Sequence, residues 1–214
     1  MHWPDFLQQG GPVLPVIVIV SLAGYAVATE RLLVWGRWMV KDRPLRRALD
    51  PAHLHSALQR TLAAGKPSPL AWILEQAQPC AGLAPAERES AVQAIVLAAI
   101  PQVGARIATI GWLGGMLPML GLLGTVAGMV LTFRSLAETT SRQVLSLGLA
   151  EALYTTLAGL LGALPLLAAH HALSRMKALW LTQVERCMAL QAQGAAQAQR
   201  TWPPAAALPR THEA

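Results

Sequence analysis

The sequence has 214 residues, of which 54% are hydrophobic and 13% are charged, with a formal net charge of +6. This composition indicates an integral membrane protein and argues against a single soluble core. No basic cluster is interleaved with aromatic side chains, so the positive charge predicts no nucleic-acid partner. A bilayer core is crossed by about 20 helical residues. Three apolar runs of that length therefore predict an all-α protein with three transmembrane helices.

The first apolar run follows a short N-terminal segment, residues 1–11, that contains no Lys or Arg. We expect residues 12–34 to form the first transmembrane helix. A signal peptide is the alternative, but its head would carry positive charge and its end would carry small residues. This run ends instead on Glu30-Arg31-Leu32. The sequence therefore predicts an uncleaved helix that is preceded by a short periplasmic N-terminus.

Basic residues crowd together directly after this run. They are Arg31, Arg37, Lys41, Arg43, Arg46 and Arg47. By the positive-inside rule, residues 35–106 should form a cytoplasmic helical segment. Asp50-Pro51 is typical of a helix start, and the Pro-rich stretches 65–69 and 79–85 predict breaks. Pro101 is expected to kink a helix that continues into the next span.

Two further spans follow, at residues 107–133 and 147–173. The polar segment between them, residues 134–146, is short enough only for a tight reversal, which predicts an antiparallel hairpin with a periplasmic turn. Arg134 and Arg142 in this turn run against the positive-inside rule, but the counts on the other side outweigh them. Residues 174–214 are expected to form a cytoplasmic helix, reaching towards Gln193, and a flexible tail.

Small residues recur at helical spacing on both helices of the hairpin. One face is predicted to hold Gly121, Thr125, Gly128 and Thr132, and the other Ala152, Thr156, Gly159 and Ala163. At 1.5 Å per residue, both Thr125 and Thr156 would lie roughly 12 Å from the same membrane surface. Such faces serve close helix packing or line a polar path. Spacing alone favours packing, with each threonine bonded to its own helix.

The second of these spans also contains one acid, Glu151. A carboxyl within a span is costly and is a functional-site candidate. The alternative is that Glu151 marks the interfacial end of the helix, where its charge suits the helix dipole. Thr156 lies about 140° around the helix from Glu151, so one copy cannot aim both side chains at a single point.

Two ordered motifs carry a family resemblance. They are PMLGLLGTVAGM at residues 118–129 and LAEALYTTLAGL at residues 149–160, followed by Pro165. Together they closely resemble the core motifs of the ExbB/TolQ/MotA proton-channel family, and most strongly its ExbB and TolQ branch. The resemblance implies a bacterial inner-membrane protein that forms a pentameric ring. The ring would surround paired helices of an ExbD/TolR-like partner that carries an Asp, and a TonB/TolA-like protein would transduce the energy. It also implies that Thr125, Thr156 and Glu151 line the proton pathway.

Other polar residues give weaker signals. His53 and His55 are splayed about 200° apart on a helix, so they predict no metal site. His170-His171 would either relay protons or simply mark a helix end, which is the commoner case. No spacing of nucleophiles, phosphate-binding glycines or metal ligands predicts an enzyme, a cofactor or a metal. Two alternative functions stay open: a scaffold that moves no ions, and a flagellar-type stator subunit. Within the resemblance itself, the sequence does not choose between an ExbB-type and a TolQ-type role.

Overall fold

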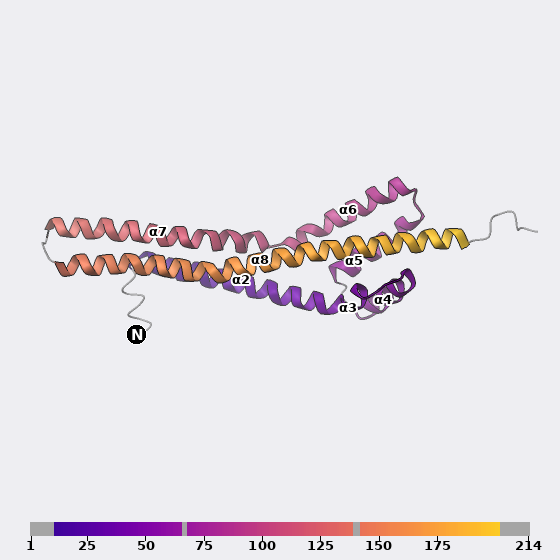
Figure 1. The fold of residues 1–214 in the computed structure, drawn as a ribbon, viewed down its shortest axis with the longest axis horizontal. Helices are drawn as coiled ribbons and strands as arrows, with labels where there is room; N and C mark the ends of the chain where they lie inside the picture. The colour runs from indigo at the N-terminus through magenta and orange to yellow at the C-terminus, as the bar shows by residue number, and fades with distance from the viewer. Residues whose placement is uncertain (1–10, 66–67, 139–141, 202–214) are drawn as a thin grey trace, which may run out of the picture. The chain divides into compact units, whose positions relative to one another are not determined.

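The computed structural model describes residues 11–65, 68–138 and 142–201, and within these residues every regular element is helical. The elements are α2 (Val13–Lys41), α3 (Arg43–Arg46), α4 (Pro51–Ala63), α5 (Pro69–Ala77), η1 (Pro79–Gly82), α6 (Pro85–Gly104), α7 (Ile107–Glu138) and α8 (Arg142–Thr201) (Figure 1). The predicted all-α class is confirmed. The N-terminal residues 1–10, the turn residues 139–141 and the tail 202–214 lie outside the described residues.

Three of these helices are long and apolar enough to cross a membrane. The candidate spans lie within Val13–Lys41, Ile107–Arg134 and Gly148–Gln197. Large hydrophobic side chains on them are exposed in the single chain, among them Met119, Val130 and Phe133. Burying such surface away from water is worth roughly 25 cal/mol per Å², so it suits lipid or protein neighbours. The prediction of three helices that could cross a membrane is confirmed.

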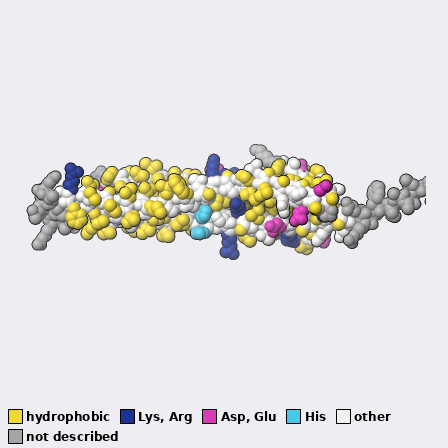
Figure 2. Space-filling model, turned by 90° about the horizontal axis from the view of Figure 1, so that it is seen from above, with side chains coloured by type: hydrophobic (Ala, Val, Ile, Leu, Met, Phe, Trp, Pro, Cys, Tyr) yellow, Lys and Arg dark blue, Asp and Glu magenta, His cyan; other side chains and the backbone are white. Residues whose placement is uncertain are grey.

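The chain divides into two compact units, and α2 and α8 each contribute to both. We call residues 1–35 and 104–176 the membrane unit, and residues 36–103 and 177–214 the polar unit. Hydrophobic side chains cover most of the visible surface of the membrane unit (Figure 2).

In the membrane unit, α2 packs against the apolar part of α8. The Tyr25 hydroxyl donates to the Gly162 carbonyl oxygen at 3.0 Å. A Cβ atom built on Gly24 would lie 2.6 Å from Cδ1 of Leu166, so the Leu166 side chain packs directly on this glycine. Ser21 is buried there, and its hydroxyl donates to the Ile17 carbonyl oxygen of its own helix at 2.7 Å. The helix pair therefore buries no unpaired hydroxyl at this point.

The helix break before α7 differs from the predicted one. Pro101 lies inside α6, which ends at Gly104, and Arg106 has a φ angle of 62°. This left-handed conformation is uncommon for any residue with a side chain and cannot continue a right-handed helix. The Arg106 guanidinium pairs with the Glu30 carboxylate of α2, and its carbonyl oxygen accepts from Ile110 N–H at 3.1 Å. The expectation of a continuous helix kinked at Pro101 is therefore wrong.

In the polar unit, the end of α8 packs beside α4 and α5. Leu58, Leu70 and Leu74 are fully buried, and Gln191 donates to the Leu74 carbonyl oxygen at 3.1 Å. The helix α8 continues past its predicted end near Gln193 to Thr201. A Cβ atom on Gly194 would lie 2.8 Å from the Pro51 Cβ atom, so this glycine permits close approach rather than ending the helix.

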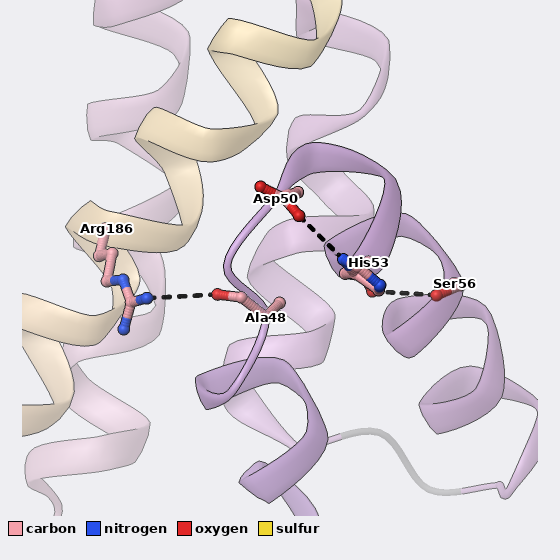
Figure 3. Close-up of polar contacts among 5 residues, drawn as sticks. All are labelled: Ala48, Asp50, His53, Ser56 and Arg186. Carbon is pink, nitrogen blue, oxygen red and sulfur yellow. Dashed lines mark hydrogen bonds and ion pairs between the residues drawn. The ribbon is translucent and has the colours of Figure 1, made fainter.

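The predicted helix start at Asp50-Pro51 is confirmed, because α4 begins at Pro51. The Asp50 side chain accepts no capping hydrogen bond from a backbone N–H of the first turn, although Asp is a favoured cap residue. Its carboxylate instead lies 3.1 Å from His53 Nδ1, while Arg186 donates to the Ala48 carbonyl oxygen at 3.3 Å (Figure 3). The loop before α4 is thereby attached to α8.

Candidate functional site

The helices α7 and α8 approach closely because small residues line both sides of their contact. A Cβ atom on Gly159 would lie 2.6 Å from the Leu117 carbonyl oxygen and 3.1 Å from the Gly121 Cα atom. One on Gly128 would lie 3.0 Å from the Ala152 Cβ atom. The small residues named from the sequence, Gly121, Gly128, Ala152, Gly159 and Ala163, all lie on the faces that meet here, and only Gly128 is not classed as buried. We call this contact the α7–α8 seam.

The seam fixes the register of the two helices. Gly128 lies opposite Ala152, and Gly121 lies opposite Gly159. In antiparallel helices this pairing brings Thr125 level with Thr155 and Thr156, within about one residue's rise of 1.5 Å. The hairpin therefore carries Thr125, Thr155 and Thr156 at one height.

Both predicted pore threonines flank the seam rather than fill it. The Thr156 hydroxyl is half-buried and donates across the seam to the Gly121 carbonyl oxygen at 3.1 Å. The Thr125 hydroxyl is partly exposed and donates to the Leu122 carbonyl oxygen of its own helix at 2.7 Å. Each hydroxyl uses its one proton in this way and keeps oxygen lone pairs that can accept.

The two threonines lie on the same side of the seam. Thr125 follows the contact residue Gly124 by one position, and Thr156 follows the contact residue Thr155 by one position. Each step turns the side chain by about 100° around its helix. Because facing antiparallel helices advance in opposite directions, these two turns lead to the same flank.

Thr155 occupies the middle of the seam, a position that the sequence analysis did not identify. Its side chain is 2% exposed, and its hydroxyl donates to Ala152 O at 2.7 Å, with Gly121 O at 3.4 Å. A Cβ atom on Gly124 would overlap the Thr155 hydroxyl. The spacing of Gly114, Leu117, Gly121, Gly124 and Gly128 at alternating steps of three and four is the sequence signal that locates this contact face.

Glu151 lies on the other flank of the seam, beside α2. It is partly exposed, and a Cβ atom on Gly11, where φ is 60°, would overlap its Oε1 atom. Gly11 directly precedes the first turns of α2, and the N-terminal end of a helix favours a carboxylate. Within one chain, the structure does not bring Glu151 together with Thr125 and Thr156.

His170 holds the opposite end of the helix pair. Its Nδ1 atom lies 2.9 Å from the Ile107 carbonyl oxygen, which fixes the hydrogen on Nδ1 because a carbonyl only accepts. A Cβ atom on Gly111 would lie 2.7 Å from the same nitrogen, so the ring sits directly on the α7 backbone. The His171 ring is edge-on to it at 5.6 Å. No group of three or more His, Cys, Asp or Glu side chains that could hold a metal occurs among the described residues.

These features define a multi-helix membrane protein that carries hydroxyl groups in and beside one tightly packed helical hairpin. The chain belongs to the MotA/TolQ/ExbB proton channel family, which matches residues 47–186 and so includes the whole hairpin. It is also 46% identical over 74 residues to "Biopolymer transport protein exbB1" of Vibrio cholerae serotype O1. That alignment covers 33% of this chain and 32% of the relative, so it spans about a third of the relative's length. The family resemblance stated from the two motifs is confirmed.

Proposed function

We propose that this chain is an ExbB/TolQ-like proton-channel subunit of an inner-membrane motor that couples the proton motive force to work on the cell envelope. The observation that carries the proposal is the placement of Thr125 and Thr156 at one height on one flank of the α7–α8 seam. Side chains on the same flank of every copy face a common centre if copies form a ring. The proposed ring is a pentamer, with the N-terminus on the periplasmic side and the C-terminus in the cytoplasm.

The proposed channel needs an acid from another chain. The apolar stretch from Gly111 to Phe133 contains no ionisable side chain, and Glu151 is the only carboxylic acid between Leu147 and Ala169. A titratable group at mid-membrane is costly when charged and is therefore retained for function. We propose that an ExbD/TolR-like partner with a single transmembrane helix supplies an Asp at the level of the threonines.

The threonine hydroxyls suit both states of such an acid. A protonated carboxyl donates to a hydroxyl oxygen, and a carboxylate accepts the hydroxyl proton once that hydroxyl turns from the backbone carbonyl to which it donates in the single chain. The Thr125 and Thr156 hydroxyls therefore stabilise the partner's Asp and the water around it before and after proton uptake. Neutralisation removes the cost of the buried charge, which allows the partner helix to turn within the ring.

Glu151 is proposed to organise protons or water at the outer mouth of the channel. It lies about three residues inside the predicted start of the span, which is roughly 4–5 Å. In support, Glu151 lies beside Gly11, just before α2, and four residues along α8 from Thr155. The turning of the partner helix would be passed to a TonB/TolA-like transducer. The work proposed is the energising of TonB-dependent uptake, with a Tol-type role as the alternative.

Proton flux into liposomes tests this proposal. The chain alone should conduct little, and co-reconstitution with an Asp-bearing partner of the ExbD/TolR type should produce flux driven by the gradient. Replacing that partner Asp by Asn provides the control and should return the flux to background. No flux with the intact partner would instead support a scaffold that moves no ions, which the glycine-lined seam would also suit.

A further inference from the structure

A buried carboxyl lies in the polar unit, far along the chain from the threonines. Asp42 stands between α2 and α3 with a relative exposure of 2%, and Ser68 at the start of α5 has 1%. The Ser68 hydroxyl donates to the Asp42 Oδ1 atom. The same hydroxyl oxygen accepts from Ala71 N–H at 3.1 Å and so caps α5. Two hydrogen bonds in series therefore connect the α2–α3 junction to the first turn of α5.

Three elements bring charged or titratable groups towards Asp42, and the cap of α5 brings the Ser68 hydroxyl. Lys41 from α2 and Arg46 from α3 favour its charged form, as does the hydrogen bond from Ser68 of α5. Cys187 from α8 lies near it, and both burial and the Asp42 charge raise the pKa of that thiol, whereas Arg186 lowers it. For Asp42 the balance is decided by burial, which raises its pKa from 3.8 to about 6.

We propose that Asp42 is a proton-binding site of the polar unit, and that its protonation strengthens the attachment of α5 to the α2–α3 junction. A neutral carboxyl loses far less solvation on burial than a carboxylate does. It also keeps a carbonyl oxygen that accepts the Ser68 hydroxyl, so the hydrogen-bond chain survives protonation. The ionised form retains the bonds but bears the cost of burial, which favours opening of α5 and entry of water.

The expected pH dependence follows from linkage. The closed state binds the proton with a pKa of about 6, and the opened state with the ordinary value of 3.8. Acid therefore favours closure, and the opening equilibrium rises as pH increases from about 4 to 6 and levels off above that range. Between pH 4.5 and pH 7.5 the opening of α5 should increase about 25-fold.

Hydrogen–deuterium exchange of the full chain in nanodiscs measures this opening. Exchange of peptides covering Pro69–Ala77, corrected for the intrinsic pH dependence of exchange, should show the stated increase. Asp42→Asn keeps the acceptor but cannot titrate, so α5 should stay protected at every pH. Asp50→Asn is the matched control, because Asp50 is exposed and pairs only with His53 among the contacts described for its carboxylate. It should leave the profile of α5 unchanged.

A further variant keeps the test decisive if Asp42→Asn does not fold. Ser68→Ala removes a hydrogen bond that lowers the Asp42 pKa, so the plateau of the profile should move above pH 6. A flat profile in the wild type, or the same pH dependence in Asp42→Asn, would overturn the proposal. Neither outcome depends on proton conduction, so this proposal and the channel proposal fail separately.

Discussion

Single hydroxyl groups carry the functional hypothesis, and each can be removed with little change in shape. In Thr125→Val and Thr156→Val the volume is nearly kept while the only donor is lost. We expect proton flux to fall at least tenfold in each, because the partner's carboxylate loses about one hydrogen bond to a charged group, worth roughly 1.5–3 kcal/mol. Flux in co-reconstituted liposomes is the measurement, and size-exclusion chromatography checks assembly.

Thr109→Val provides a control on the same helix, since Thr109 is exposed near the start of α7. Its flux should match the wild type. Full flux in both Thr125→Val and Thr156→Val would contradict the assigned role of the hydroxyls.

Glu151 has two possible roles, of which the structure adds the second through its contact with Gly11. As a proton or water organiser, its charge matters, so Glu151→Gln should lower proton flux severalfold while the complex still assembles. As a partner for the start of α2, it would affect stability instead, by about 0.3–1 kcal/mol. Measuring flux and thermal unfolding on the same preparation distinguishes them, and unchanged flux with a lowered melting temperature would assign it to the helix end.

The residues that sequence reasoning missed share one property. Thr125 and Thr156 were identified because spacing and a family motif are local properties of the chain. Asp42 is hydrogen-bonded to Ser68, which is 26 positions away in the sequence. The residues next to either one in the sequence give no signal that the two side chains pair. Thr155 was left without a role because the face on which it packs is set by Gly124 of the other helix. Burial and pairing of this kind depend on tertiary contacts.

At the scale of the helices, the glycines of the seam set how closely α7 and α8 can pack. Gly159→Ala would place a methyl group 2.6 Å from the Leu117 carbonyl oxygen, which belongs to a helix backbone and cannot rotate away. We expect the membrane unit to lose about 1–3 kcal/mol, the usual cost of overpacking. The measurement is thermal unfolding in detergent, followed by helical circular dichroism.

Gly115→Ala is the matched control on α7. A Cβ atom at Gly115 meets nothing within 4 Å, and Ala is the better helix former by up to about 1 kcal/mol. This variant should therefore be equally stable or more stable. If the Gly159→Ala protein unfolds at the wild-type temperature, α7 and α8 can move apart at the seam without loss of stability, which would contradict the prediction.

Helix existence was predictable here, whereas helix ends were less so. Long apolar runs and the Asp50-Pro51 start located α2, α7, α8 and the beginning of α4. The break at Arg106 was misplaced at Pro101 because Arg is not a typical helix breaker, and its left-handed conformation coincides with an ion pair to Glu30 of another helix. The length of α8 was underestimated because Gly194 usually signals a helix end, yet here it accommodates Pro51.

At the scale of the whole chain, the membrane and polar units depend on different forces. The membrane unit exposes large apolar side chains that suit lipid or other copies, among them Trp112, Leu122 and Leu164. The polar unit contains its own buried core of leucines in α4 and α5, and also the buried acid Asp42. Changes of pH should therefore act on the stability of the polar unit through Asp42.

The direction of this effect follows from the raised pKa of Asp42, about 6 in the folded chain against 3.8 for the exposed group. The folded state holds the proton more tightly than the unfolded state does, so protonation of Asp42 stabilises the folded state, and this contribution is complete below about pH 4. The contribution is lost as pH rises to about 6, and the free energy of unfolding then changes no further through Asp42. The total loss is on the order of 3 kcal/mol. The Asp42→Asn variant does not undergo this loss, because its amide is neutral and still accepts a hydrogen bond from Ser68. The variant should unfold at a higher temperature than the wild type at pH 7.5 and at nearly the same temperature at pH 4. Calorimetry at both pH values, with Asp50→Asn as control, measures the difference, and equal melting temperatures at pH 7.5 would mean that the carboxylate of Asp42 is better solvated than its burial implies.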